Sequence, residues 1–258
     1  MCSNDSLGIR YRVLSWVFLG GVVGMLLGLT GAGGSIIALP LLQFLMGMSV
    51  HEASVAVLPI VGVAALLSVF PQRRHVHLRL AAVVLGVSIP VTYAMAWAKP
   101  FVPEPVITGL ILLFIGWAFV QTWRRSDDRV VAFPLSIGIS GVVVGSVAGA
   151  LTTLTGLGGG ILLTPLLARL TRLSAAETTA TAILVIAGNA FLSFVIQGAP
   201  TGVLRLSSFG VMVLGVLVAN VGVIWLTRAC PTVYFQRLRK WVYVGVLLLA
   251  ALLLLIAG

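Results

Sequence analysis

Two glycine-rich stretches carry the groups best suited to hold an anion. They read Thr30-Gly31-Ala32-Gly33-Gly34-Ser35 and Thr155-Gly156-Leu157-Gly158-Gly159-Gly160. A glycine-rich turn in front of a helix directs unpaired N–H groups and the positive end of the helix dipole at one point. Together with the hydroxyls of Thr30, Ser35 and Thr155, such amides would hold a small oxyanion without a buried arginine. The alternative is tight packing, because small residues also recur where membrane helices touch.

The two stretches belong to a longer internal repeat. Residues 29–72 match residues 154–197 without a gap, at a constant offset of 125 (154 minus 29). A proline follows each stretch at the matching positions Pro40 and Pro165. Because the glycines and prolines recur in register, we favour a paired anion site, brought together by the symmetry of the repeat, over packing alone.

A serine and a glutamate recur in each copy just before a long apolar segment. Ser49 is followed three residues later by Glu52, and Ser174 by Glu177. This spacing predicts a capping box, in which each side chain bonds the backbone N–H of the other residue. The alternative is a proton-coupling carboxylate, since ionisable groups at membrane depth usually serve function. We favour the capping box.

Further polar residues interrupt the apolar segments. Gln72 and Gln197 end the repeat, each with a serine four residues earlier on the same helix face, and this face either lines a polar path or meets headgroups. Thr181 and Asn189 either contact a substrate or hydrogen-bond a neighbouring helix. The candidate substrate-binding residues are Thr30, Gly31, Gly33, Gly34, Ser35, Gln72, Thr155, Gly156, Gly158, Gly159, Gly160, Thr181, Asn189 and Gln197, and the candidate proton-coupling residues are Glu52 and Glu177.

Composition defines the elements that must position these residues. The chain of 258 residues is 60% hydrophobic and only 9% charged, with a mean hydropathy of +1.16. A soluble domain of this size needs far more charge to cover its surface. Since the apolar residues fall in long runs rather than short alternating segments, we expect an all-α polytopic membrane protein and not a β-barrel.

Ten apolar segments divide into two halves of five. They span approximately 11–29, 35–48, 53–70, 80–98, 106–123, 131–154, 160–170, 178–196, 206–227 and 241–256. The segments 35–48 and 160–170 are too short to cross about 30 Å of hydrocarbon, so we expect broken or re-entrant helices there; whether they cross fully stays open. The membrane repeats are 1–126 and 127–258, within one integral membrane domain.

The basic residues orient the segments. With the N-terminus outside, the inside loops hold Arg73, Arg74, Arg79, Arg124, Arg125, Arg129, Arg169, Arg172, Arg228, Arg237, Arg239 and Lys240, and the outside holds Arg10, Arg12, Lys99 and Arg205. This inside bias explains the net charge of +10 without nucleic acid as a partner. Because each half has an odd number of segments, the second enters from the opposite side, which predicts an inverted-topology repeat.

No residue set is typical of an enzyme or a metal centre. His75 and His77 lie among arginines without a cysteine or carboxylate, which favours a basic loop over a metal site. The two cysteines, Cys2 and Cys230, have no metal-type or redox-type spacing. We therefore expect no catalytic residues, no metal and no cofactor.

The duplicated motif resembles the sulfite exporter TauE/SafE family of membrane permeases. The resemblance rests on glycines followed by an apolar stretch, proline and leucine at 31–41 and again at 156–166, and it covers nearly the whole chain. It implies a transporter of small anions, typically sulfur-containing ones such as sulfite or sulfonates, in a prokaryotic inner membrane. The second copy offers Thr181 where the first reads Ala56, so the implied site is asymmetric.

The residues and the resemblance together predict a secondary transporter. It would move a small inorganic or organic anion (sulfite, sulfonate or thiosulfate) across the cytoplasmic membrane by alternating access. An anion channel and a non-transporting membrane assembly subunit are the alternatives. Membrane lipid is the expected environment, while proton or ion coupling and homo-oligomerisation stay open.

Overall fold

The computed structural model describes residues 34–124, 136–156, 158 and 160–198, with isolated positions 218, 222, 245, 248, 249 and 252. In these residues every regular element is a helix. The elements are α2 (Gly34–Met46), α3 (Val50–Val69), the 3₁₀ helix η1 (Phe70–His75), α4 (Leu78–Ala98), the 3₁₀ helix η2 (Lys99–Phe101), α5 (Glu104–Arg124), α6 (Ile137–Thr155), α7 (Gly160–Leu170) and α8 (Ala175–Gln197). The all-helical prediction is confirmed for this part of the chain.

Four helical segments are long and apolar enough to cross a membrane. They are Val50–His75, Leu78–Phe101, Ile137–Thr155 and Ala175–Gln197. Helices α2 and α7 have 13 and 11 residues, which at 1.5 Å per residue is too short to span. The prediction of short helices after each glycine-rich stretch is therefore correct. The expected segments 11–29, 206–227 and 241–256 and the boundary between the repeats lie outside the described residues, apart from isolated positions.

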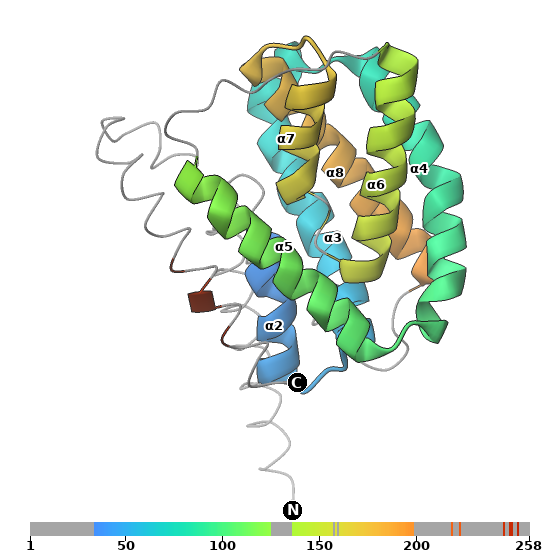
Figure 1. The fold of residues 1–258 in the computed structure, drawn as a ribbon, viewed down its shortest axis with the longest axis vertical. Helices are drawn as coiled ribbons and strands as arrows, with labels where there is room; N and C mark the ends of the chain where they lie inside the picture. Colours follow the sequence, from blue (N-terminus) through green and yellow to red (C-terminus); the bar gives the residue numbers. More distant parts are fainter. Residues whose placement is uncertain are drawn as a thin grey trace, which may run out of the picture.

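Helices α3 and α8 form the centre of the bundle and run antiparallel (Figure 1). The backbone N–H of His77, after the end of α3, donates a hydrogen bond to Thr181 near the start of α8. At the other end Ser54, near the start of α3, and Gln197, the last residue of α8, bond the same lysine. Every residue of α3 from 56 to 62 is buried, so neighbours surround this helix on all sides.

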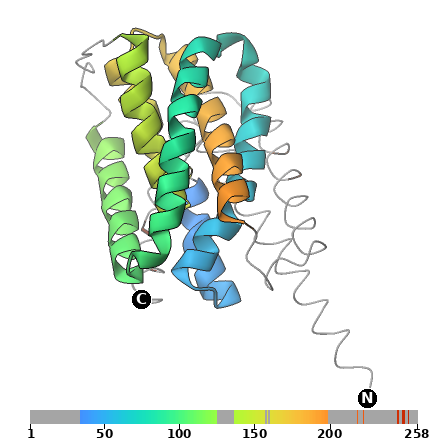
Figure 2. The same ribbon diagram turned by 90° about the vertical axis from the view of Figure 1, so that its right-hand side faces the viewer.

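Small residues bring α6 against α4, two helices that lie side by side in both views (Figures 1 and 2). Gly141, Gly145 and Gly149 are spaced four residues apart and face α4. A Cβ atom at Gly145 would lie 2.6 Å from the carbonyl oxygen of Val84 and 3.0 Å from the Cβ of Val87. This glycine stripe therefore permits backbone contact between two membrane helices, as small residues at such spacing do.

Both predicted capping boxes are confirmed. The Ser49 hydroxyl accepts from the N–H of Glu52 at 3.3 Å, and the Glu52 carboxylate accepts from the N–H of Ser49 at 3.2 Å. The same reciprocal pair joins Ser174 and Glu177, at 3.3 and 2.9 Å. Each box satisfies N–H groups that have no partner within the helix at the start of α3 and α8.

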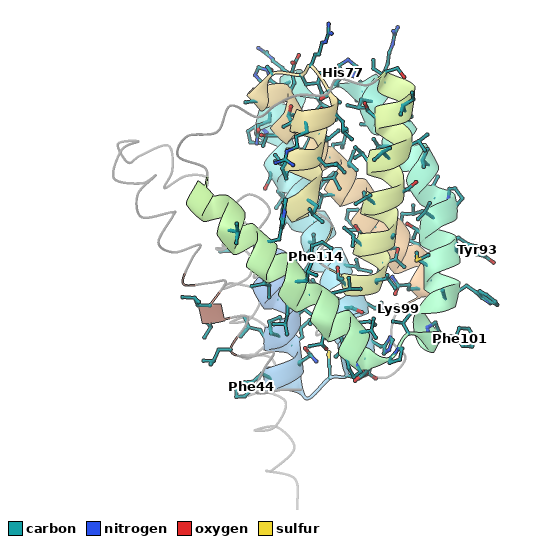
Figure 3. All side chains as sticks on the ribbon, viewed as in Figure 1. Phe44, His77, Tyr93, Lys99, Phe101 and Phe114 are labelled. Atoms are coloured by element: carbon teal, nitrogen blue, oxygen red, sulfur yellow. The ribbon has the colours of Figure 1, made fainter. Side chains whose placement is uncertain are left out.

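The two ends of the bundle differ in chemistry. One end carries the exposed basic side chains of Arg73, Arg74, Arg79, Arg169 and Arg172. The other carries exposed aromatic residues, among them Tyr93, Trp97 and Phe101. Figure 3 shows His77 at the first end, and Tyr93 and Phe101 toward the second. Clustered arginines at one end of apolar helices, and tyrosine and tryptophan near the other, are typical of the two membrane–water interfaces.

The glycine stripe generates a prediction about stability. The substitution Gly145→Leu should lower the free energy of unfolding, by about 1–3 kcal/mol relative to Gly138→Leu, because the added side chain meets the α4 backbone. Gly138 lies on the same helix, and a Cβ there would meet no atom within 4 Å, so its substitution shares the change in helix propensity without the clash. Unfolding with sodium dodecyl sulfate in mild detergent would measure both variants. Equal stability would show that the stripe does not determine the α4–α6 packing.

Candidate functional site

One face of α8 carries buried polar side chains through the apolar bundle. Asn189, Ser193 and Gln197 follow one another at intervals of four residues, which places them on one helix face. Asn189 and Ser193 are completely buried, and Gln197 is half-buried. We call these three residues the α8 polar face. Buried amides and hydroxyls in a membrane helix need partners, so the surroundings of this face define the candidate site.

The middle of the α8 polar face contacts α6. The hydroxyls of Ser193 and Thr153 lie 3.3 Å apart, and Thr153 also donates to the carbonyl oxygen of Gly149 at 2.7 Å. Since the Thr153 proton is used in that second bond, Ser193 is the donor between the two hydroxyls. This pair joins the two helices through a hydrogen bond inside the bundle.

The α8 polar face has unpaired polar atoms at Asn189, its member nearest the start of α8. Both polar atoms of the Asn189 side chain are buried and have no partner within the described part of the chain. The same holds for the hydroxyls of Thr152 on α6 and Thr92 on α4. An unpaired buried polar group costs about 1–3 kcal/mol, so polar atoms of this kind are where a water or ligand is expected.

At Gln197, the last residue of α8, the α8 polar face contacts a buried lysine. Lys99 begins η2 at the end of α4 and is 4% exposed. Its Nζ atom donates to the Ser54 hydroxyl on α3 and to Gln197 Oε1 on α8, both at 2.6 Å. Figure 3 shows Lys99 at the end of the bundle opposite His77. The lysine thereby connects α3 of the first sequence copy to α8 of the second.

The structure adds burial to the expected position of Lys99. The sequence predicts this residue among the outside charges that orient the segments, and its side of the membrane stays a prediction. In the described residues Lys99 begins the connection after α4, and its side chain is buried. Its isolation was the signal that could have indicated this. Lys99 stands alone between two long apolar runs, away from the arginine clusters.

The second glycine-rich stretch lies next to this lysine. Gly156 ends α6 with a φ of 70°, and a Cβ there would overlap the Ser54 carbonyl oxygen and lie 2.8 Å from the Ser54 Cα. Gly158 has a φ of 68°, and its Cβ would lie 2.7 Å from Val61 Cγ1 and 3.1 Å from Ile186 Cγ2. The stretch therefore packs between α3 and α8, and its glycines meet a steric need. That they also bind an anion stays a prediction.

The remaining candidates of the glycine-rich stretches make only local contacts or lie outside the described residues. Thr155 donates to the carbonyl oxygen of Leu151 at 2.7 Å, and Gly160 begins α7. In the first copy Gly34 begins α2, and the side chain of Ser35 lies outside the part of the chain that the structure describes. Thr30, Gly31, Gly33 and Gly159 lie outside the described residues. The convergence of the two stretches therefore also stays a prediction.

Other candidates lie away from the lysine. Thr181 accepts the hydrogen bond from His77 at 3.0 Å, at the opposite end of the bundle. Gln72 donates to the carbonyl oxygen of Ser68 in its own helical stretch at 3.3 Å, whereas its counterpart Gln197 bonds another helix. Glu52 and Glu177 lie in their capping boxes at the helix starts.

No group of three or more metal-ligating side chains occurs in the ranges that the structure describes. His77 has a local role, since its Nδ1 accepts from the N–H of Leu80 at 3.3 Å and caps α4. This histidine among the arginines thus gains a structural function at the basic end of the bundle.

A helical bundle with four segments long and apolar enough to cross a bilayer defines the class of membrane-embedded helical proteins. The model of the family described as Sulfite exporter TauE/SafE matches residues 16–254, and the chain belongs to this family. Comparisons with curated proteins and with solved structures give no match.

The contact between Gly156 and Ser54 can be tested with a matched pair of glycines. Gly156→Ala should destabilise the protein more than Gly47→Ala. Both glycines follow a helix with a positive φ, 70° and 62°, and both donate their N–H to the carbonyl oxygen four residues earlier, so both variants carry a comparable backbone strain. Of the two, only Gly156 is close to another helix, because a Cβ at Gly47 meets nothing within 4 Å. Thermal unfolding in detergent would compare the two, and equal losses would contradict the close packing of α6 on α3.

Proposed function

We propose that the protein is a secondary transporter that moves a small sulfur-containing anion, such as sulfite, a sulfonate or thiosulfate, across the cytoplasmic membrane of a prokaryote. Membership of the TauE/SafE family is the observation that carries the proposal. The α8 polar face supports it, because unpaired polar atoms inside an apolar bundle are expensive and mark solute pathways in membrane proteins.

The arrangement of α3 and α8 supports an inverted repeat. These helices follow the two glycine-rich stretches at equivalent places in the two sequence copies, and they run antiparallel. Each is preceded by a short helix, α2 or α7. Transport would then proceed by rocking of one repeat against the other around a substrate held between them.

Charge supports an orientation with the arginine-rich end in the cytoplasm. A negative-inside potential drives an anion outward by about 2.3 kcal/mol per charge per 100 mV. Export would therefore need no coupling ion. The substrate would bind main-chain amides of the glycine-rich stretches together with side chains of the α8 polar face.

Flux into proteoliposomes tests the proposal. Purified protein should take up radiolabelled sulfite, a sulfonate or thiosulfate with saturable kinetics and should show counterflow, because a carrier must bind its substrate in each cycle. Non-saturating conduction would indicate an anion channel instead. Absence of flux for the whole anion panel, with correctly inserted protein, would favour a non-transporting assembly subunit.

The two glutamates give a separate prediction. Glu177→Gln should leave the rate of transport and its pH dependence within about twofold of wild type, because glutamine also completes a capping box. Glu52→Gln should behave alike, since its box has the same geometry. Transport would be measured between pH 5 and pH 8. Loss of pH dependence in one variant alone would assign proton coupling to that carboxylate.

A further inference from the structure

We propose that Lys99 and Gln197 form an anion-binding subsite at the non-arginine end of the bundle, where the lysine supplies the positive charge for the substrate. The inference rests on the proposed anion transport and adds a residue that the glycine-rich motif does not contain. It depends on the burial of Lys99, on the donors left free around it and on its place in the fold.

The lysine lacks a counter-charge. Its side chain is 4% exposed and makes no ion pair with any carboxylate in the described part of the chain. The described acidic residues are Glu52, Glu104 and Glu177, and two of these serve capping boxes. A buried charge without a partner is strongly unfavourable. A bound anion would supply the missing partner.

The free hydrogen-bonding groups around Lys99 are donors. An ammonium has three N–H groups, of which two are used by Ser54 and Gln197. The Ser54 hydroxyl donates its own proton to the carbonyl oxygen of His51 at 2.7 Å, so it offers no further proton. Gln197 Nε2 is buried and has no partner among the described residues. The third ammonium N–H and the Gln197 amide are thus available together.

This set of donors selects the ligand. Lys99 Nζ lies 2.6 Å from Gln197 Oε1, and the free Nε2 belongs to the same planar amide, so one small oxyanion can accept from Nζ and Nε2 through separate oxygens. A cation would be repelled by the ammonium. The set therefore matches a compact oxyanion such as sulfite or the sulfonate group.

The place of the cluster connects it to the predicted site. Gly156 of the second glycine-rich stretch packs on the backbone of Ser54, and Gln197 ends the α8 polar face. The subsite therefore lies where the polar face, the glycine-rich stretch and the lysine meet. Because it lies opposite the arginines, it belongs to the end that the proposed orientation turns away from the cytoplasm.

Equilibrium binding to the purified full-length protein tests the subsite. Sodium sulfite would be titrated by calorimetry in detergent at constant ionic strength, with sodium chloride as the reference salt. Lys99→Gln should raise the Kd at least about tenfold, and Lys99→Arg should restore part of the affinity. Arg79→Gln removes the same charge from the exposed opposite end of α4 and should leave the Kd unchanged.

Two neutral substitutions keep the test valid if Lys99→Gln fails to fold. Gln197→Leu should raise the Kd about threefold or more by removing a free donor, whereas the control Thr179→Val, which removes a hydroxyl from the exposed opposite end of the same helix, should not. Ser54→Ala removes an acceptor of the lysine and the local bond to the His51 carbonyl oxygen but no donor for the anion, so the Kd of this variant should not rise. An equal Kd for wild type and both Lys99→Gln and Gln197→Leu would overturn the subsite.

Further outcomes separate the subsite from the proposed function. Wild-type protein that does not bind sulfite, methanesulfonate or thiosulfate would overturn the subsite. Competition for Lys99 by phosphatidylglycerol but not by these anions would also overturn it and assign the lysine to a lipid headgroup. Binding that depends on Lys99, in protein that shows no flux, would overturn the transporter and retain the subsite. Flux with an unchanged KM in Lys99→Gln would overturn the subsite and retain the transporter.

Discussion

A polar group inside an apolar membrane bundle must find its partner within the protein or in a bound solute, and this constraint governs the structure. The starts of α3 and α8 lie at the exposed edge of the bundle, where capping boxes pair the first backbone N–H groups. Helices α4 and α6 approach through glycines, which add no polar group at all. The buried Lys99 finds acceptors on two helices. Its hydrogen bonds to Ser54 and Gln197 connect α3 to α8. The few atoms that remain unpaired, such as those of Asn189, therefore stand out as places for a solute.

Features with short-range causes could be predicted from the sequence. The interval from 160 to 170 coincides with α7, because glycines on one side and a polar stretch on the other limit the apolar run. The pairing of Ser174 with Glu177 follows from a spacing of three residues and needs no tertiary information. Helix lengths, and with them the short α2 and α7, follow from the same local pattern.

The candidate site required tertiary information that no local pattern contains. Gln72 and Gln197 occupy equivalent positions with a serine four residues earlier, yet Gln72 bonds its own helical stretch and Gln197 bonds Lys99. The difference arises from a residue 98 positions away in the chain. The partners of Lys99 also required the path of the chain, because its isolation between two apolar runs marks the residue but does not indicate Ser54 or Gln197.

The contacts of Lys99 bear on the alternating access that we propose. If one repeat rocks against the other, α3 and α8 separate at one end, and the lysine must give up Ser54 or Gln197 as a partner. Without a solute this leaves a poorly compensated buried charge, which disfavours opening. A bound oxyanion would replace the lost acceptor and so stabilise the open arrangement more than the closed one. Such a difference in affinity between two states is what a ligand needs to shift a conformational equilibrium, and a lysine that bonds helices of both sequence copies would provide it in the proposed cycle.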